Sequence, residues 1–145
     1  MKSRIKLVEN MQFVATADSG HAVLMDAPQS VGGNNSGAKP SELLLMAFGG
    51  CSGMDIISIL RKKKQEVASF EVNVQGDTPE KHPRYFTNIH IEYVVTGRNI
   101  SEDAVKKAIA LSLNTYCMVG LTIGKAAKIT HSYRIVDEGG KEGRS

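Results

Sequence analysis

Hydrophobic and polar positions in the first part of the chain predict a small antiparallel sheet followed by a long loop. Residues 5–8, 12–17 and 21–26 are short β-prone runs separated by polar turn signals, the pattern of a three-stranded meander. Residues 27–40 are rich in Gly, Asn, Ser and Pro. Loops of this length without structure of their own are uncommon and often functional.

A long apolar helix is predicted over residues 40–63. Pro40 suits a first helical turn, Glu42 lies near the positive end of the helix dipole, and the cations of 61–64 lie near its negative end. Its apolar residues fall on every side, which indicates a helix buried all round. Such a helix is about 36 Å long, too long for a chain of this size to bury alone. We therefore expect a second copy of the chain to cover it, in a homodimer.

The second half alternates strands with a helix. Residues 70–75 and 86–96 each alternate apolar and polar side chains, which predicts an antiparallel hairpin with one buried face. Ser101 is a good N-cap for a helix over 102–116, and residues 128–135 alternate again as a last strand. This order of strands and helices predicts an α+β fold.

Composition narrows the class of protein. The chain has 145 residues, of which 41% are hydrophobic and 23% charged, as expected for one globular domain. We assign this domain to residues 1–137 and a flexible, charged, glycine-rich tail to 138–145. The net charge of +3 and the absence of a basic aromatic motif disfavour a nucleic-acid partner.

The N-terminal residues point to a cytoplasmic protein. Charged residues interrupt the first ten positions, so no segment there has the composition of a signal peptide. The longest uninterrupted apolar run, 43–48, is far shorter than a membrane span. We therefore predict a cytoplasmic location and no membrane association.

The two cysteines are the main candidates for chemistry. Cys51 and Cys117 lie 66 residues apart, so they form neither a CxxC pair nor a zinc ribbon by local spacing. Cys51 lies within GGCSGMD, whose small residues leave room for a substrate or another backbone. It is about three turns from the helix start, too deep for strong help from the dipole, and a carboxylate at Asp55 would oppose its ionisation. The residues alone leave both an inert buried thiol and a reactive thiol open.

The sequence predicts no metal site and no cofactor. The four histidines have no ligand spacing, and the phosphate-binding pattern GxxxxGK[ST] is absent. One of them falls on the apolar alternation of the last strand, which favours a core position, with a position within reach of the cysteines as the alternative. The histidines are His21, His82, His90 and, on that strand, His131.

Residues 11–136 combine a Gly-rich loop, a proline-led apolar helix with a mid-helix cysteine, and a second cysteine that ends a later helix. The motifs are PSEL from Pro40, GGCSGMD around Cys51, YCMV around Cys117, and ITHSYRI in the last strand. In these features the chain resembles the OsmC/Ohr family of osmotically inducible protein C and organic hydroperoxide resistance proteins. The resemblance implies an OsmC-like fold, an intertwined homodimer whose antiparallel sheets wrap the central helices.

The same resemblance implies a function. In this family the first cysteine attacks a hydroperoxide and becomes a sulfenic acid, and the second resolves it as a disulfide. A thiol or a dihydrolipoyl-type reductant then restores the pair. The resemblance therefore implies a peroxidase for organic hydroperoxides, active in the oxidative stress response, with Cys51 and Cys117 as its catalytic residues.

The activating residues differ from the family pattern. Its peroxidases activate the cysteine with an early-loop arginine, held by a glutamate directly after the proline. Here Ser41 stands at that position and Glu42 follows it, while the early loops contain no arginine. Ser41, Glu42 and Asp55 are therefore candidates for substrate-binding or activating residues, with helix capping the alternative role for the first two. A different cation would have to activate Cys51. The candidates are Arg84, Arg98, Arg134 and side chains of the second copy.

Two other classes of function stay open. One is a non-catalytic OsmC-like protein that senses redox state or binds a small apolar ligand, and the other is a structural interaction module. The enzyme hypothesis requires the two cysteines within disulfide reach of each other and a cation near the Cys51 sulfur.

Overall fold

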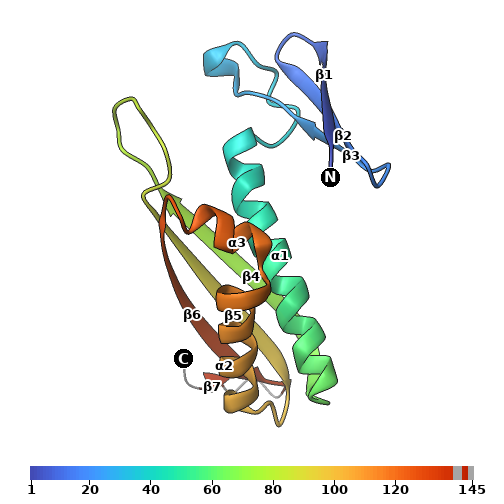
Figure 1. Cartoon of the computed structure of the whole chain (residues 1–145), viewed down its shortest axis with the longest axis vertical. Helices are drawn as coiled ribbons and strands as arrows, with labels where there is room; N and C mark the ends of the chain where they lie inside the picture. Colours follow the sequence, from blue (N-terminus) through green and yellow to red (C-terminus); the bar gives the residue numbers. More distant parts are fainter. Residues whose placement is uncertain (139–141, 144–145) are drawn as a thin grey trace. The chain divides into compact units, whose positions relative to one another are not determined.

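The computed structural model describes residues 1–138 and 142–143 and has an α+β architecture (Figure 1), which confirms the predicted class. The chain divides into two compact units, Met1–Leu44 and Leu45–Ser145. The assignment of 1–137 to a single domain stays a prediction. Most of the predicted tail, 138–145, lies outside the described residues, but Glu142–Gly143 forms a short strand, β7.

The first unit contains the predicted meander. Strands β1 (Ser3–Glu9), β2 (Gln12–Ala17) and β3 (Ala22–Met25) pair antiparallel in the order β1-β2-β3. A 3₁₀ turn, η1 (Gln29–Val31), follows in the long loop. The predicted strand pattern is therefore confirmed, with boundaries that differ by one or two residues.

Asp26 organises the loop between β3 and the long helix. Its side chain is 3% exposed and accepts hydrogen bonds from the backbone N–H groups of Ala27, Asn34 and Ser36. The Ser36 hydroxyl donates a further one at 2.6 Å and is the main cause of the lowered pKa of Asp26. A carboxylate that accepts several hydrogen bonds is held ionised. The loop is therefore an ordered structure closed around one buried carboxylate.

The long helix α1 (Pro40–Lys62) begins and ends within one residue of its prediction. Its buried residues lie on one face only: Phe48, Gly49, Ser52, Gly53, Ile56 and Leu60. Met46 is 57% exposed and Met54 is 73% exposed. The expectation of burial on all sides is therefore wrong for the single chain, because the second sheet covers only one side of the helix.

Within the described residues, α1 is the one helix long and apolar enough to cross a membrane by length and composition. Of its most apolar 18-residue window, 28% is buried inside the chain. Core helices of soluble proteins can have the same length and apolar composition. The longest uninterrupted apolar run, 43–48, did not indicate a helix of this apolar character, because glycine and polar residues interrupt the apolar positions of α1.

The second unit contains a four-stranded sheet. Its strands are β4 (Glu66–Asp77), β5 (Asn88–Arg98), β6 (Lys128–Asp137) and β7, in that order. The predicted hairpin of β4 and β5 is confirmed, with alternate residues of β5 from Ile89 to Val95 buried. The expectation of antiparallel pairing throughout is wrong at one place, since β5 and β6 pair parallel. A parallel pair needs a crossover connection, and a helical segment supplies it here.

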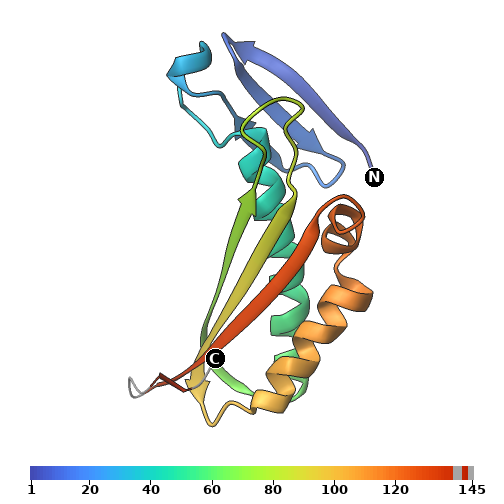
Figure 2. The ribbon, with the colours of Figure 1, turned by 90° about the vertical axis from the view of Figure 1, so that its left-hand side faces the viewer.

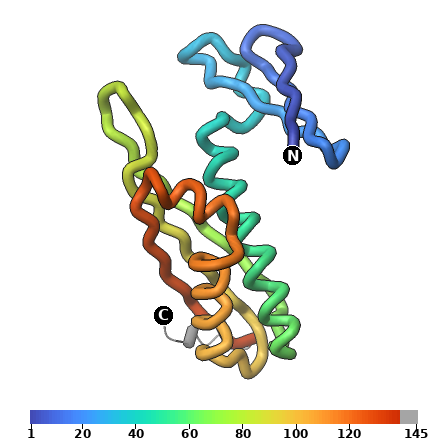
Figure 3. The backbone as a smooth tube through the Cα atoms, in the orientation of Figure 1, coloured from blue at the N-terminus to red at the C-terminus, as the bar shows by residue number. Residues whose placement is uncertain are grey.

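The crossover consists of three helical pieces that can be followed along the backbone in Figure 3. They are α2 (Glu102–Leu111), the π-helical turn η2 (Ser112–Tyr116) and α3 (Met118–Ile123). Ser101 caps α2 as predicted, since its hydroxyl accepts from the backbone N–H of Ala104 at 3.2 Å. The predicted helix over 102–116 changes to a π turn in its last part, and α3 was not predicted.

The helices α1, from Leu45 onward, and α2 cover the same face of the second sheet (Figure 2). Glycines permit close packing there: a Cβ at Gly49 would lie 3.0 Å from Val74, and one at Gly53 would lie 3.3 Å from Val72. His131 is exposed, so its predicted core position is wrong. The helices cover this face of β6 only in part, since none of the residues of β6 is fully buried.

Candidate functional site

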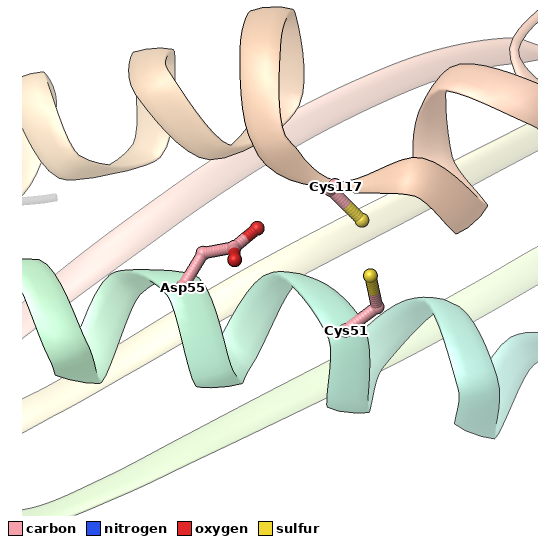
Figure 4. Close-up of side chains that lie close together, drawn as sticks. All are labelled: Cys51, Asp55 and Cys117. Carbon is pink, nitrogen blue, oxygen red and sulfur yellow. The ribbon is translucent and has the colours of Figure 1, made fainter.

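The fold brings the two cysteines together. Cys51 lies in the middle of α1, and Cys117 lies in the short segment between η2 and α3. Their sulfur atoms face each other (Figure 4) and lie within 4.8 Å. Both thiols are free. Two cysteines 66 residues apart in the sequence are therefore neighbours in space, as the enzyme hypothesis requires.

The π turn positions Cys117. In η2 the backbone N–H of Cys117 donates to the carbonyl of Ser112 at 2.8 Å, five residues back. Such turns are rare and often occur at functional sites. The chain then leaves the helix at Cys117 in an extended conformation and starts α3. This break points the Cys117 sulfur toward α1.

The two sulfurs differ in their environments. Cys117 is fully buried, whereas Cys51 is partly buried. Burial raises the pKa of Cys117 to about 12, although the backbone N–H of Gly120 donates to its sulfur at 3.3 Å and opposes the shift. The neighbouring Cys51 and Asp55 raise it further. Cys51 is therefore the thiol that a solute can reach, and Cys117 is the protonated partner behind it.

Asp55 completes a compact cluster with the cysteines. It lies one turn after Cys51 on the same face of α1, and one of its carboxylate oxygens lies within 4.8 Å of both sulfurs. The Ser112 hydroxyl donates to its Oδ2 at 3.0 Å. The candidate residue Asp55 is therefore placed at the cysteine pair.

A buried chain of hydroxyl groups ends at this carboxylate. Ser52 Oγ lies 2.6 Å from the Tyr93 hydroxyl and 2.9 Å from Ser112 Oγ, and all three side chains are fully buried. Because Ser112 donates to Asp55, its oxygen accepts from Ser52, and Ser52 in turn accepts from Tyr93. All three hydroxyls thus donate in the direction of Asp55, which fixes the position of its carboxylate.

This buried chain was not predicted as part of the site. Two signals for it were present in the sequence: Ser112 interrupts the apolar stripe of the predicted helix 102–116, and Tyr93 falls on the buried face of a strand. A buried tyrosine hydroxyl usually requires a hydrogen-bond partner. The partners could not be named without the fold, because they come from three different elements.

The proposed cation candidates lie in other interactions. Arg84 donates to Thr78 at 2.9 Å, Arg98 pairs with Glu138 at 3.6 Å, and Arg134 pairs with Glu92 at 3.1 Å. Across residues 1–138 and 142–143, no lysine or arginine forms an ion pair with Asp55. Among the described residues, each of the three arginines suggested from the sequence therefore has a partner outside the cysteine cluster.

Ser41 and Glu42 belong to the first unit, whereas the cysteine cluster belongs to the second. Glu42 accepts from the backbone N–H of Lys39 at 2.8 Å and pairs with its ammonium group at 3.5 Å. These contacts lower the pKa of Glu42, the backbone hydrogen bond most of all. Glu42 thus performs the helix-capping role, and a role for either residue in substrate binding stays a prediction.

The site also contains a possible ligand set for a metal ion. The sulfurs of Cys51 and Cys117 and a carboxylate oxygen of Asp55 all lie within 4.8 Å of one another. Histidine spacing, on which the sequence prediction of no metal site rested, could not detect this set, because no histidine takes part.

The buried thiol of Cys117 and the buried phenol of Tyr93 predict a loss of stability at alkaline pH. Burial raises the pKa of Tyr93 from 10.0 to about 12 and that of Cys117 from 9.0 to about 12. The unfolded chain therefore loses these protons at lower pH than the folded chain does. The free energy of unfolding should fall as pH rises from about 9 to about 12, by at most about 1.4 kcal/mol per pH unit for each group. Urea unfolding of the reduced protein at a series of pH values measures this slope.

Two variants provide the control for this slope. Cys117→Ser and Tyr93→Phe each remove one titrating group, so each should show a shallower decline than the unchanged protein at the same protein concentration. Equal slopes in all three proteins would show that neither group is responsible.

The sequence matches a family model and a curated protein over most of its length. Residues 33–132 match the family model described as OsmC-like protein. The curated protein YhfA of Escherichia coli K12 is 44% identical over 139 residues, covering 94% of this chain and 98% of YhfA. The span of these matches includes both cysteines and Asp55.

Solved structures share the fold. A hypothetical protein from Aquifex aeolicus VF5 has 30% identity and a TM-score of 0.82, with 94% of this chain and 96% of that chain covered. An organic hydroperoxide resistance protein OsmC from Legionella pneumophila has 11% identity and a TM-score of 0.64, with 92% and 96% covered. The predicted OsmC-like fold is thereby confirmed.

Proposed function

This chain belongs to the OsmC-like protein family, and we propose that it is a thiol-dependent peroxidase that reduces organic hydroperoxides through Cys51 and Cys117. The observation that carries the proposal is the approach of the two sulfurs to within 4.8 Å. One fold relative is named an organic hydroperoxide resistance protein, which supports the substrate class.

The accessibility of the two thiols assigns their roles. The partly buried Cys51 is the peroxidatic residue: its thiolate attacks one oxygen of the hydroperoxide and the O–O bond breaks. The alkoxide takes up a proton and leaves as the alcohol, while Cys51 becomes a sulfenic acid. The fully buried Cys117 is the resolving residue, because only a neighbouring group can reach its sulfur.

Disulfide formation completes the oxidation. Cys117 attacks the Cys51 sulfur and gives up its proton, the S–O bond breaks, and hydroxide and that proton leave as water. The two sulfurs must close from within 4.8 Å to the bond length of about 2.05 Å. A dithiol of the dihydrolipoyl class then reduces the disulfide and is itself oxidised to a disulfide.

Asp55 is the proton acceptor that this step requires in our proposal. The resolving thiol has a pKa of about 12, so it is protonated at neutral pH. The Asp55 carboxylate lies within 4.8 Å of the Cys117 sulfur, and the Ser112 hydroxyl holds it there at 3.0 Å. Removal of the proton as the S–S bond forms avoids a free buried thiolate.

We further propose that the working form is a homodimer in the cytoplasm. The exposed face of α1 carries Met46 and Met54, and a soluble protein rarely leaves such residues together in water. The first sheet also exposes large apolar side chains: Ile5, Leu7, Val8, Val23 and Leu24. A second copy would cover these surfaces and could supply the activating cation for Cys51.

A second candidate function is the binding of a small apolar ligand. A cavity of about 480 Å³ is lined mostly by apolar residues of α2, η2, α3 and β6, together with Asn114, Lys125 and His131. This volume is within the usual range for small-molecule sites.

The test of the peroxidase proposal is turnover by tag-free, reduced protein. We expect consumption of tert-butyl hydroperoxide with equimolar oxidation of dihydrolipoamide, and a slower reaction with a monothiol reductant, because a dithiol reduces a protein disulfide intramolecularly. No consumption above the protein-free rate would contradict the proposal and favour the ligand-binding candidate.

A further inference from the structure

The cluster of two thiols and one carboxylate has the composition of a soft metal site. We propose that the reduced protein binds a Zn²⁺ ion through Cys51, Cys117 and Asp55. This inference uses residues of the proposed peroxidase site but does not depend on hydroperoxide chemistry.

The spacing of the ligand atoms fits such an ion. Their sulfur and oxygen atoms lie within 4.8 Å of one another. A tetrahedral Zn²⁺ with Zn–S bonds of about 2.3 Å and a Zn–O bond of about 2.1 Å brings its ligand atoms to about 3.6–3.8 Å apart. Rotation of the side chains by a small amount closes this difference. Figure 4 shows all three groups converging on the space between α1 and the Cys117 segment.

The chemistry of the donor set selects the metal. Two thiolates favour Zn²⁺ over the hard ions Mg²⁺ and Ca²⁺, which prefer oxygen ligands. Three protein ligands leave a fourth position for water, the arrangement of open zinc sites. The partial exposure of Cys51 and Asp55 gives the ion and this water access from solvent.

Neighbouring hydrogen bonds support each ligand. Ser112 donates to Oδ2 of Asp55 at 3.0 Å and leaves Oδ1 available for the metal. The backbone N–H of Gly120 donates to the Cys117 sulfur at 3.3 Å, which stabilises a thiolate. Ser112 is in turn hydrogen-bonded to Ser52, and Ser52 to Tyr93. Such an outer layer of partners orients ligands and tunes affinity in metal sites.

Metal binding and oxidation should exclude each other. A disulfide between Cys51 and Cys117 removes two of the three ligands, so an oxidised protein loses the ion. Conversely, an ion bound to both thiolates withdraws negative charge from the sulfurs and so lowers their reactivity toward a hydroperoxide. We therefore expect the site to exist in two forms, a metal-bound reduced form and a metal-free disulfide form.

The experiment uses Co²⁺ as a spectroscopic probe and Zn²⁺ as its competitor, with tag-free reduced protein under anaerobic conditions. We expect one equivalent of Co²⁺ to produce thiolate-to-cobalt charge-transfer absorption and the visible bands of tetrahedral cobalt. Zn²⁺ should remove both at one equivalent. Asp55→Asn should weaken Zn²⁺ binding by about 10–100-fold, and Ser112→Ala should weaken it by about tenfold.

The matched control is Asp77→Asn, since Asp77 is an exposed aspartate at the end of β4; it should bind Zn²⁺ as the unchanged protein does. Cobalt absorption without a charge-transfer band, or Zn²⁺ affinity that Asp55→Asn leaves unchanged, would overturn the ligand set. Circular dichroism checks that each variant is folded.

The same titration separates this inference from the peroxidase proposal. Protein that binds Co²⁺ but keeps its thiols when the metal-free form is treated with hydroperoxide has the metal site without the enzyme. Protein that forms the disulfide but binds no Co²⁺ through sulfur has the redox pair alone, which overturns the metal site.

Discussion

Replacing Cys51 by serine should lower the rate of hydroperoxide consumption by more than about 100-fold, because a serine hydroxyl cannot replace a thiolate as the attacking nucleophile. Cys117→Ser should keep the first oxidation step, since Cys51 is the more accessible sulfur. The sulfenic acid then persists, because no second thiol resolves it. Stopped-flow measurement of a single turnover separates the two variants.

A relocated thiol provides the control for this comparison. In the double variant Cys51→Ser/Ser58→Cys, the number of thiols is unchanged and the new one lies on the exposed side of α1 two turns away. We expect it to be as slow as Cys51→Ser. Recovery of the rate in the double variant would show that any exposed thiol suffices and that the site geometry contributes nothing.

Replacing Met54 by glutamate should convert the proposed homodimer to a monomer. Met54 is 73% exposed in the single chain, so the substitution costs the monomer little. In a dimer that buries this face of α1, an unpaired carboxylate in an apolar interface costs several kcal/mol, enough to lower association by more than about 100-fold. Sedimentation velocity at several protein concentrations measures the change.

The control for dimerisation is Gln75→Glu, which introduces the same charge on an exposed polar position of β4. It should leave the sedimentation coefficient unchanged. If the Met54→Glu protein sediments as an assembly of the same mass as the unsubstituted protein, this face of α1 is not the interface, whatever the oligomeric state.

Much of the fold could be predicted from the periodicity of the sequence. The strands of the meander, the hairpin of β4 and β5 and the ends of α1 all follow local signals, such as turn residues, alternation and helix caps. The π turn η2 and helix α3 could not be predicted this way. Their shape depends on the packing of Ser112 and Cys117 against α1, which local propensity does not record.

The parallel pairing of β6 with β5 has the same kind of cause. The alternation of apolar and polar residues is the same for a parallel and an antiparallel strand. Only the length and path of the crossover decide which way β6 pairs with β5. The exposed position of His131 also follows from the fold, because β6 is covered on that side only in part. Alternation identifies the two faces of a strand, but it does not tell which residues of the inner face the helices actually bury.

The sequence predicted the two cysteines of the candidate site, but it did not predict the side chains around them. The pairing of Cys51 with Cys117 came from family resemblance, and the fold places them together. The role of Asp55 and the hydroxyl chain from Tyr93 depends on side chains of three elements that meet only after folding. Among the described residues no lysine or arginine forms an ion pair with Asp55, so the cation that the enzyme hypothesis places near Cys51 stays a prediction.

The central claim is that Cys51 and Cys117 form a redox pair, and intact mass with thiol titration after one equivalent of an organic hydroperoxide tests it most directly. We predict prompt loss of both thiols and a mass decrease of about 2 Da, the two hydrogens lost when a disulfide forms. In Cys117→Ser we predict a gain of about 16 Da, the oxygen of a sulfenic acid. Thiols that remain reduced for hours at neutral pH, with unchanged mass, would contradict the claim.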